Sequence, residues 1–383
     1  MRHAKVFLCA LAAAWACSSS ARACSVPVFR YALERWENAP YQAVVFHRGP
    51  LADADKRGVE MLKSAGDSPK GTANILLETV DVDTLSDPKS KSINVRTLAK
   101  LWAAQKNPAL PWTVLLYPQG NDELEPFWSG PLDVERIARL ITSPVRTEIA
   151  RKLTDGDSVV WVVLLSGDKQ KDDGATKLLT AELAALQKTI ALPKDEDTQG
   201  GPVVHRRSDL PLKISFSIVP VSRTDPAEAM FAAMLIGIDK RFRDATQPAA
   251  FPIFGRGRAL TGLTGKDFAA ATIGEATVFL TGACSCQVKE LNPGVDLLFN
   301  TDWESIVSGE KSIEKTAPAI EIPIPKLPAP AEKKPADAVN TNTEKVAPPG
   351  AGPARDWLLI GLVLSGALII VTGALLLKSK HKN

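Results

Sequence analysis

Three cysteines after residue 23 are the side chains in this sequence that could carry redox or metal chemistry. Cys24 lies near the N-terminus, whereas Cys284 and Cys286 form a Cys-x-Cys pair. A disulfide inside so close a pair would be strained and easily reduced, which suits thiol exchange. Thiolates are also preferred ligands of Cu(I) and Zn²⁺. Alternatively, Cys24 bonds one member of the pair and the cysteines are structural. The sequence leaves all three hypotheses open.

Two arginines in a glycine-rich turn are the second candidate site. The run Gly255-Arg256-Gly257-Arg258 resembles a phosphate loop, but Leu260 stands where the dinucleotide pattern requires a third glycine. We therefore expect a tight turn between two strands. Arg256 and Arg258 could still offer positive charge to an anion.

No other pattern in the sequence indicates a catalytic site clearly. His47 follows an apolar run and could act as a base, although a lone histidine is more often structural or solvated. Zincin, serine-hydrolase and EF-hand motifs do not occur in the sequence. The net charge of +3 does not indicate a nucleic-acid partner. The sequence identifies no cofactor.

The first residues have the order of a secretory signal peptide. Two basic residues at positions 2 and 5 precede an apolar run over 6–16, and Ala-Arg-Ala follows at 21–23. We expect cleavage after Ala23, so that the signal peptide is 1–23 and the mature chain begins at Cys24. Lipidation of that cysteine is a rival hypothesis, which Arg22 disfavours because a small residue is expected there.

The other end predicts a single transmembrane helix. Residues 357–377 form a run of 21 residues without charge. It would be about 31 Å long as a helix, enough to cross the hydrocarbon core. Lysines at 378, 380 and 382 follow directly. Because positive charge favours the cytoplasmic side, the tail 378–383 is expected inside, and the bulk of the chain in the periplasm or outside the cell.

A proline-rich stretch separates this predicted helix from the rest. Residues 316–356 contain nine prolines with alanine, lysine and glutamate between them. Such a composition buries too little apolar surface to fold and predicts an extended, disordered spacer. A proline-rich ligand for a partner domain is the alternative. Of the 383 residues, roughly 290 remain for globular structure, enough for two domains.

Within that globular part, short apolar runs alternate with runs at helical spacing. The first half predicts strands at 41–47, 74–82, 112–117 and 127–128, and helices at 51–65, 95–105 and 132–141, the last with an optional continuation past Pro144. The second half predicts strands at 159–165, 212–219, 249–254 and 258–260, and helices at 175–190, 227–236 and 271–280. The charged runs 169–173 and 194–197 are interpreted as solvated loops. Both halves read β-α-β-α-β-β-α, which indicates an α/β fold with an internal duplication.

This order resembles the thioredoxin fold, as two tandem copies over residues 25–282. In that family a proline, usually after a cis bond, directly precedes the third strand, where Pro111 and Pro248 stand here. The family's Cys-x-x-Cys dithiol follows the first strand. The matching positions read His-Arg-Gly-Pro at 47–50 and Ser-Gly-Asp-Lys at 166–169. The resemblance therefore implies the fold without the usual redox activity.

Together these features predict two tandem thioredoxin-like domains, 24–155 and 156–315, followed by the spacer and the membrane helix. The leading hypothesis is a non-catalytic, single-pass, membrane-tethered protein that binds or assembles a partner protein outside the cytoplasm. The alternative is a thiol redox or copper- or zinc-handling protein that uses Cys284 and Cys286.

Overall fold

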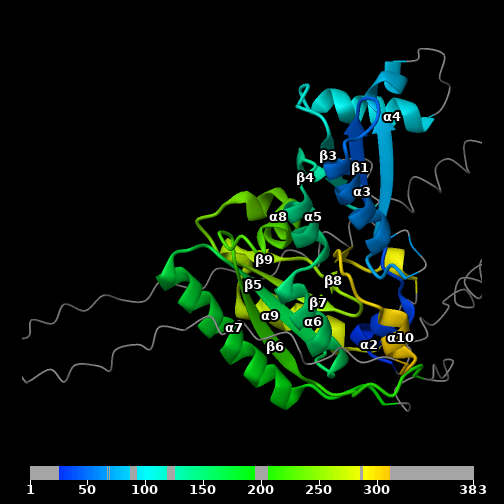
Figure 1. Ribbon diagram of the computed structural model, residues 1–383. Helices are drawn as coiled ribbons and strands as arrows, with labels where there is room; N and C mark the ends of the chain where they lie inside the picture. The colour runs from blue at the N-terminus through cyan, green and yellow to red at the C-terminus, as the bar shows by residue number, and fades with distance from the viewer. Residues whose placement is uncertain are drawn as a thin grey trace, which may run out of the picture. The chain divides into compact units, whose positions relative to one another are not determined.

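The computed structural model describes residues 26–66, 68, 70–86, 93–118, 126–194, 206–284 and 288–310 (Figure 1). By internal contacts the chain divides into residues 1–320 and residues 321–383, and every described residue belongs to the first unit. This unit is a mixed α/β structure with two β-sheets.

The first sheet has four strands in the order β2-β1-β3-β4. β2 is parallel to β1, β3 is antiparallel to β1, and β4 is antiparallel to β3. Helices α3 and α5 cover one face, whereas α4 covers the other. The elements are β1 (Tyr41–His47), α3 (Asp53–Ala65), β2 (Ile75–Asp81), η1 (Val82–Ser86), α4 (Ile93–Ala104), β3 (Trp112–Leu116), β4 (Pro126–Pro131) and α5 (Val134–Ile141).

The second sheet repeats this pattern of directions. Its order is β10-β8-β7-β5-β6, and β9 also pairs with β7. β6 is parallel to β5, β7 is antiparallel to β5, and β8 is antiparallel to β7. The elements are β5 (Val159–Leu165), α7 (Lys169–Thr189), β6 (Phe216–Ser222), α8 (Ala229–Gly237), η3 (Lys240–Arg243), β7 (Ala249–Phe254), β8 (Arg258–Ala259), β9 (Leu263–Thr264), η4 (Gly265–Asp267), α9 (Ala270–Thr281), η5 (Lys289–Leu291) and β10 (Val295–Asp296). The predicted order β-α-β-α-β-β-α is present in the first half, whereas the second half adds β9 between β8 and α9 and β10 after α9.

Two helix predictions differ from the structure for local reasons. The chain does not continue as one helix through Pro144. Instead, α5 ends at Ile141 and α6 (Pro144–Thr154) begins anew, with Pro144 in its first turn. The Ser143 hydroxyl caps α6 by accepting a hydrogen bond from Arg146 N at 3.0 Å.

The charged run 169–173 was wrongly expected as a loop and is the first turn of α7. The Asp168 carboxylate accepts hydrogen bonds from Gln170 N at 3.0 Å and Lys171 N at 3.2 Å, and this cap starts the helix six residues early. β6 begins at Phe216 rather than at residue 212. In the part of the chain that the structure describes, the Leu110–Pro111 bond is the one cis peptide bond.

The N-terminal helix α2 (Val28–Arg35) precedes β1 in the sequence but packs into the second half. Its buried side chains share a core cluster with residues of β5, β7 and α9. At the first residue of α2, Val28 N donates to Gly282 O at 3.0 Å, and just before the helix Val26 O accepts from Cys284 N at 3.1 Å. The first described residues therefore complete the second half.

The two halves share one continuous apolar core, which contains residues of β1, α5 and α6 together with β5, β7 and α8. Asn74, just before β2, ties them further. Its amide nitrogen donates to Ala39 O at 2.9 Å and Leu297 O at 3.2 Å, and its amide oxygen accepts from Phe299 N at 2.8 Å. The short helix α10 (Trp303–Val307) closes the described chain and packs Trp303 into the same core.

Across the described ranges, no helix combines the length and apolar character needed to cross a bilayer. The predicted signal peptide 1–23, spacer 316–356, membrane helix 357–377 and tail 378–383 all lie outside the described residues. Those predictions stay predictions.

Candidate functional site

The loop after β1 occupies the first position at which the resemblance places an active dithiol. His47 Nδ1 lies 2.8 Å from Gly49 O, and it must carry the proton because a carbonyl oxygen only accepts. The Asp81 carboxylate, at the end of β2, accepts from Gly49 N at 3.1 Å and from Asp83 N at 3.0 Å. Arg48 Nε lies 3.0 Å from the Asp83 carboxylate on the surface. Polar groups of the loop thus bind one another.

The electrostatics of this loop favour ionised Asp81. The hydrogen bond from Asp83 N lowers its pKa most, and the bond from Gly49 N and the charges of His47 and Arg48 lower it further. Asp81 therefore acts as a structural acceptor rather than as an acid at neutral pH. Gly49 has a φ of +62°, a conformation that favours glycine and lets the chain turn back toward Asp81.

The equivalent loop after β5 is closed by the buried Asp172 carboxylate. It accepts from Ser166 N at 2.8 Å, from the Ser166 hydroxyl at 2.8 Å, and from Gly167 N at 3.0 Å. Arg223 braces the other side, where its Nε donates to Leu165 O at 3.0 Å and its Nη1 donates to Phe242 O at 3.1 Å. Neither loop sequence contains a thiol, and both arrangements are fixed by internal hydrogen bonds.

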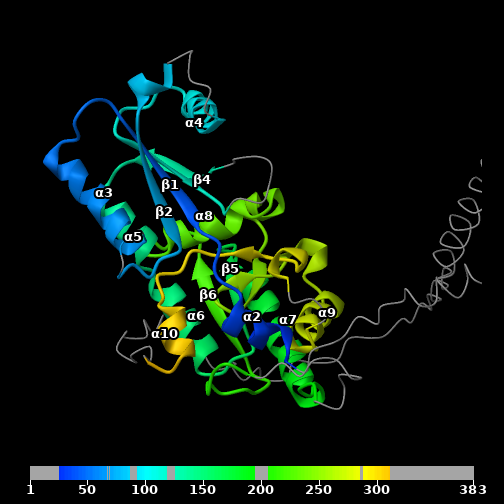
Figure 2. The ribbon, with the colours of Figure 1, turned by 90° about the vertical axis from the view of Figure 1, so that its right-hand side faces the viewer.

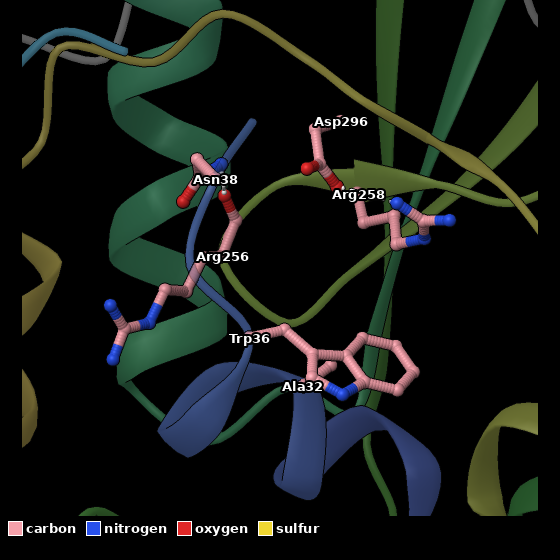
Figure 3. A pocket seen from close by; sticks show the side chains of 6 residues that line it. All are labelled: Ala32, Trp36, Asn38, Arg256, Arg258 and Asp296. Atoms are coloured by element: carbon pink, nitrogen blue, oxygen red, sulfur yellow. Dashed lines mark hydrogen bonds and ion pairs between the residues drawn. The ribbon is translucent and has the colours of Figure 1, made fainter. Parts of the chain in front are cut away.

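The arginines predicted to bind an anion lie around a very small cavity (Figure 3). The cavity measures about 10 Å³, which is at the limit of space for a single water molecule. Figure 3 shows the guanidinium groups of Arg256 and Arg258 pointing in different directions. The lining residues are Ala32, Trp36, Asn38, Arg256, Arg258 and Asp296.

Arg256 is bound to the helices α2 and α10. Its Nε donates to Leu33 O at 2.8 Å, and its Nη2 lies 2.7 Å from the Glu304 carboxylate at the start of α10. The expected tight turn is confirmed, since β7 ends before it and β8 begins after it. Gly255 and Gly257 adopt φ values of +58° and +90° there.

Arg258 is bound instead to the buried Asp296 of β10, at 2.7 Å. Lys289 approaches the same carboxylate at 2.6 Å, and the Trp36 ring lies 5.9 Å from the Arg258 guanidinium carbon. Both arginines line the same small cavity, but each guanidinium is bound to a carboxylate of its own, Arg256 to Glu304 and Arg258 to Asp296. The structure uses each to join elements of the second half, and anion binding by them stays a prediction.

Of the three predicted cysteines, the structure describes Cys284. It follows α9, is 1% exposed, and pairs through its backbone N–H with Val26, two residues after Cys24. Cys24 and Cys286 lie outside the described residues. Among the described side chains, no group of three histidine, cysteine or acidic residues is suited to hold a metal ion. The disulfide, redox and metal predictions for these cysteines are therefore untested.

Two buried charged residues at the junction of the halves, Arg146 and Glu228, were missed by the sequence. Glu228, at the start of α8, accepts from Val145 N at 2.9 Å and from the Ser143 hydroxyl at 2.5 Å. Arg146 donates to the carbonyl oxygens of Leu298 and Leu140. Burial lowers the pKa of Arg146 to about 10 and raises the pKa of Glu228. In the sequence, a charged residue in a helix is normally expected at the surface. No local pattern therefore indicates that Arg146 and Glu228 are buried.

No protein-family model matches this chain, and no curated protein matches it. Among solved structures, the chain is similar to the crystal structure of full-length ERdj5, at 11% sequence identity and a TM-score of 0.18. The match covers 66% of this chain and 32% of ERdj5, so this chain spans about a third of that protein's length.

Proposed function

We propose that this chain is a membrane-tethered protein whose two thioredoxin-like halves bind or assemble a partner protein outside the cytoplasm without catalysing thiol exchange. The observation that carries this proposal is the pair of loops after β1 and β5. Each lacks cysteine, and each commits its polar groups to internal hydrogen bonds.

The thioredoxin-like part of the proposal rests on the repeated topology. Both halves repeat one parallel and two antiparallel strand pairs in the same sequence, and the second half adds the short strands β9 and β10. Pro111 stands directly before β3 after a cis bond, and Pro248 stands directly before β7.

Binding is tested by photocrosslinking from a surface position of the first loop. A photoreactive amino acid replaces Arg48, whose side chain is 64% exposed, in the full chain within native membranes. We expect one discrete adduct. The matched control places the same amino acid at Thr180, on the exposed side of α7. If no adduct forms from position 48, or if positions 48 and 180 give equal yields, binding through this loop is contradicted.

Catalysis is tested with a model disulfide substrate. The purified full chain and its Cys286→Ser variant should show the same background rate of disulfide reduction. A rate that exceeds background and disappears in Cys286→Ser would instead establish thiol exchange. Mass spectrometry after alkylation, with and without reductant, would then show whether Cys24, Cys284 and Cys286 are bonded, reduced or metal-bound.

Orientation is tested by protease treatment of intact cells or spheroplasts. We expect residues of the described unit to be digested from outside, while an epitope added after Asn383 stays protected. Protection of the described unit together with digestion of the epitope would refute the tethered orientation.

A further inference from the structure

A second cavity lies where the two halves meet, and it measures about 40 Å³. Residues 141–143, 146 and 147 line one side, at the turn from α5 into α6. Residues 299–301, which follow β10, line the other side. Figure 2 shows α5 above α6, with the yellow segment that leads into α10 beside them. The cavity is thus formed by segments that are distant in the sequence.

Arg146 is the charged residue that lines this cavity, and it is 3% exposed. Its guanidinium donates to the backbone carbonyl oxygens of Arg139, Leu140 and Leu298. These bonds use three of its five N–H hydrogens, and each acceptor is uncharged. Among the described residues, its Nε has no hydrogen-bond partner, and no carboxylate forms an ion pair with the guanidinium. Arg146 is therefore a buried positive charge with donors to spare.

A buried charge of this kind is costly unless a charge of opposite sign lies against it. Burial lowers the pKa of Arg146 to about 10, so the guanidinium stays charged at neutral pH. Glu228 opposes this shift through its charge, but its carboxylate is bound to the Ser143 hydroxyl and to Val145 N. An anion beside Arg146 would supply the direct contact that Glu228 does not.

Three further side chains that line the cavity can donate hydrogen bonds to an anion: Thr142, Asn300 and Thr301. The Asn300 amide oxygen accepts from the Thr72 hydroxyl at 2.6 Å, which leaves its amide nitrogen as a donor. The cavity also lies at the N-terminus of α6, where the helix dipole places partial positive charge. None of the described residues that line the cavity is acidic. These surroundings favour negative charge.

The volume of the cavity restricts the class of anion. A single water molecule requires about 10–15 Å³ of such space, so the cavity has room for about three heavy atoms. A carboxylate group has three heavy atoms in one plane, which match the planar guanidinium, whereas a phosphate or sulfate group has five. Thr142 and Asn300 are exposed, so the rest of a carboxylate ligand can extend into solvent between them.

We propose that this cavity binds a carboxylate group, with Arg146 as its positive partner and Thr142, Asn300 and Thr301 as hydrogen-bond donors. A small free carboxylate and the C-terminus of a partner protein share this chemistry. Only the second source rests on the proposed function, which crosslinking from position 48 tests separately.

Thermal unfolding of the purified full chain tests the site with sodium formate as the probe. Sodium methanesulfonate is the matched control, because it has the same charge but carries five heavy atoms. At 100 mM of either salt and neutral pH, we expect formate to give a melting temperature about 3–6 °C higher, as binding with a Kd of about 10 mM would produce. Equal melting temperatures in the two salts would overturn the proposal.

Two variants place the effect at this cavity. Arg146→Met should abolish the formate shift, and Thr142→Val, an isosteric change at an exposed position, should at least halve it. The matched control Thr180→Val, on the exposed side of α7, should keep the full shift. If Arg146→Met does not fold, Thr142→Val decides the outcome. A full formate shift in Thr142→Val would show that formate binds elsewhere, and the proposal would fail.

A peptide distinguishes the two sources of the carboxylate. Acetyl-trialanine with a free C-terminus is compared with its C-terminal amide, which carries no carboxylate. A melting temperature raised by the acid form alone, and lost in Thr142→Val, supports the C-terminus of a partner protein as the ligand. A shift with formate but with neither peptide supports a small free carboxylate instead. If neither formate nor the acid peptide raises the melting temperature, the cavity binds no carboxylate.

Discussion

The buried ion pair between Arg30 and Glu34 allows a quantitative test of how α2 is held. Both side chains are almost fully buried, and the Arg30 Nε–Glu34 Oε1 distance is 2.7 Å. Glu34 also accepts from Arg207 N at 2.8 Å and from the Ser208 hydroxyl at 3.0 Å. Arg30 in turn donates to Leu210 O at 2.9 Å. The pair fastens α2 to the segment 206–211 before β6.

Glu34→Ala should therefore be strongly destabilising. Burial lowers the pKa of Arg30, and Glu34 is the main group that opposes this shift. Removing the carboxylate leaves the buried charge of Arg30 without its counter-ion, and it leaves three backbone or hydroxyl donors of Arg207 and Ser208 without this acceptor. Breaking one partner of a buried pair costs about 3–5 kcal/mol. At about 2–4 °C per kcal/mol, the melting temperature should fall by about 6–20 °C.

Thermal unfolding of the full chain, followed by circular dichroism, measures this shift. The control is Asp173→Ala, which removes an exposed pair with Lys169 and should cost about 0.5 kcal/mol or less. The double variant Arg30→Met with Glu34→Leu should lose less stability than the sum of its two single variants, because no buried charge remains. A Glu34→Ala shift no larger than that of Asp173→Ala would refute the reasoning.

Three further predictions test other parts of the fold by the same unfolding measurement. Gly237→Ala should cost about 1–3 kcal/mol, because the added Cβ would overlap the Tyr117 hydroxyl. Gly274→Ala, by contrast, meets open space inside a helix and should stabilise the protein by about 0.5–1 kcal/mol. Asn74→Ala removes three hydrogen bonds at the junction and should cost about 3 kcal/mol, more than Asn38→Ala, which removes one. Burial raises the pKa of Glu228 in the folded state, so folding is favoured when it is protonated. Relative to Glu228→Gln, the native protein should lose stability as pH rises from about 4.5 through the raised pKa, and a pH-independent difference would contradict this.

The sequence predicted the buried strands well because their pattern is unambiguous. The runs at 159–165 and 249–254 are apolar along their whole length, as expected of strands covered on both faces, and the structure gives them the same bounds. The first residues of helices were harder to predict from the sequence than the bounds of these strands. The charged start of α7 looked like a loop because its stability comes from the Asp168 cap rather than from an apolar face.

The candidate site could be predicted less well because its contacts are distant in sequence. The turn at 255–258 was predicted from its glycines, but the partners of its arginines, Asp296 and Glu304, follow 38 and 48 residues later. No local pattern indicates that these charges meet. The same holds for Asn74, whose partners lie 35 to 225 residues away.

The position of α2 sets an order of events for biosynthesis. Arg256 binds the α2 carbonyl of Leu33 across 223 residues, and the α2 apolar face packs on β7 and α9. This helix, the first in the described part of the chain, therefore has no complete binding surface until α9 is synthesised. At about 5–20 residues per second this takes about 10–45 s. Throughout that interval the apolar face of α2 lacks the surface that it covers in the folded unit, which favours transient binding of this helix by a holding chaperone.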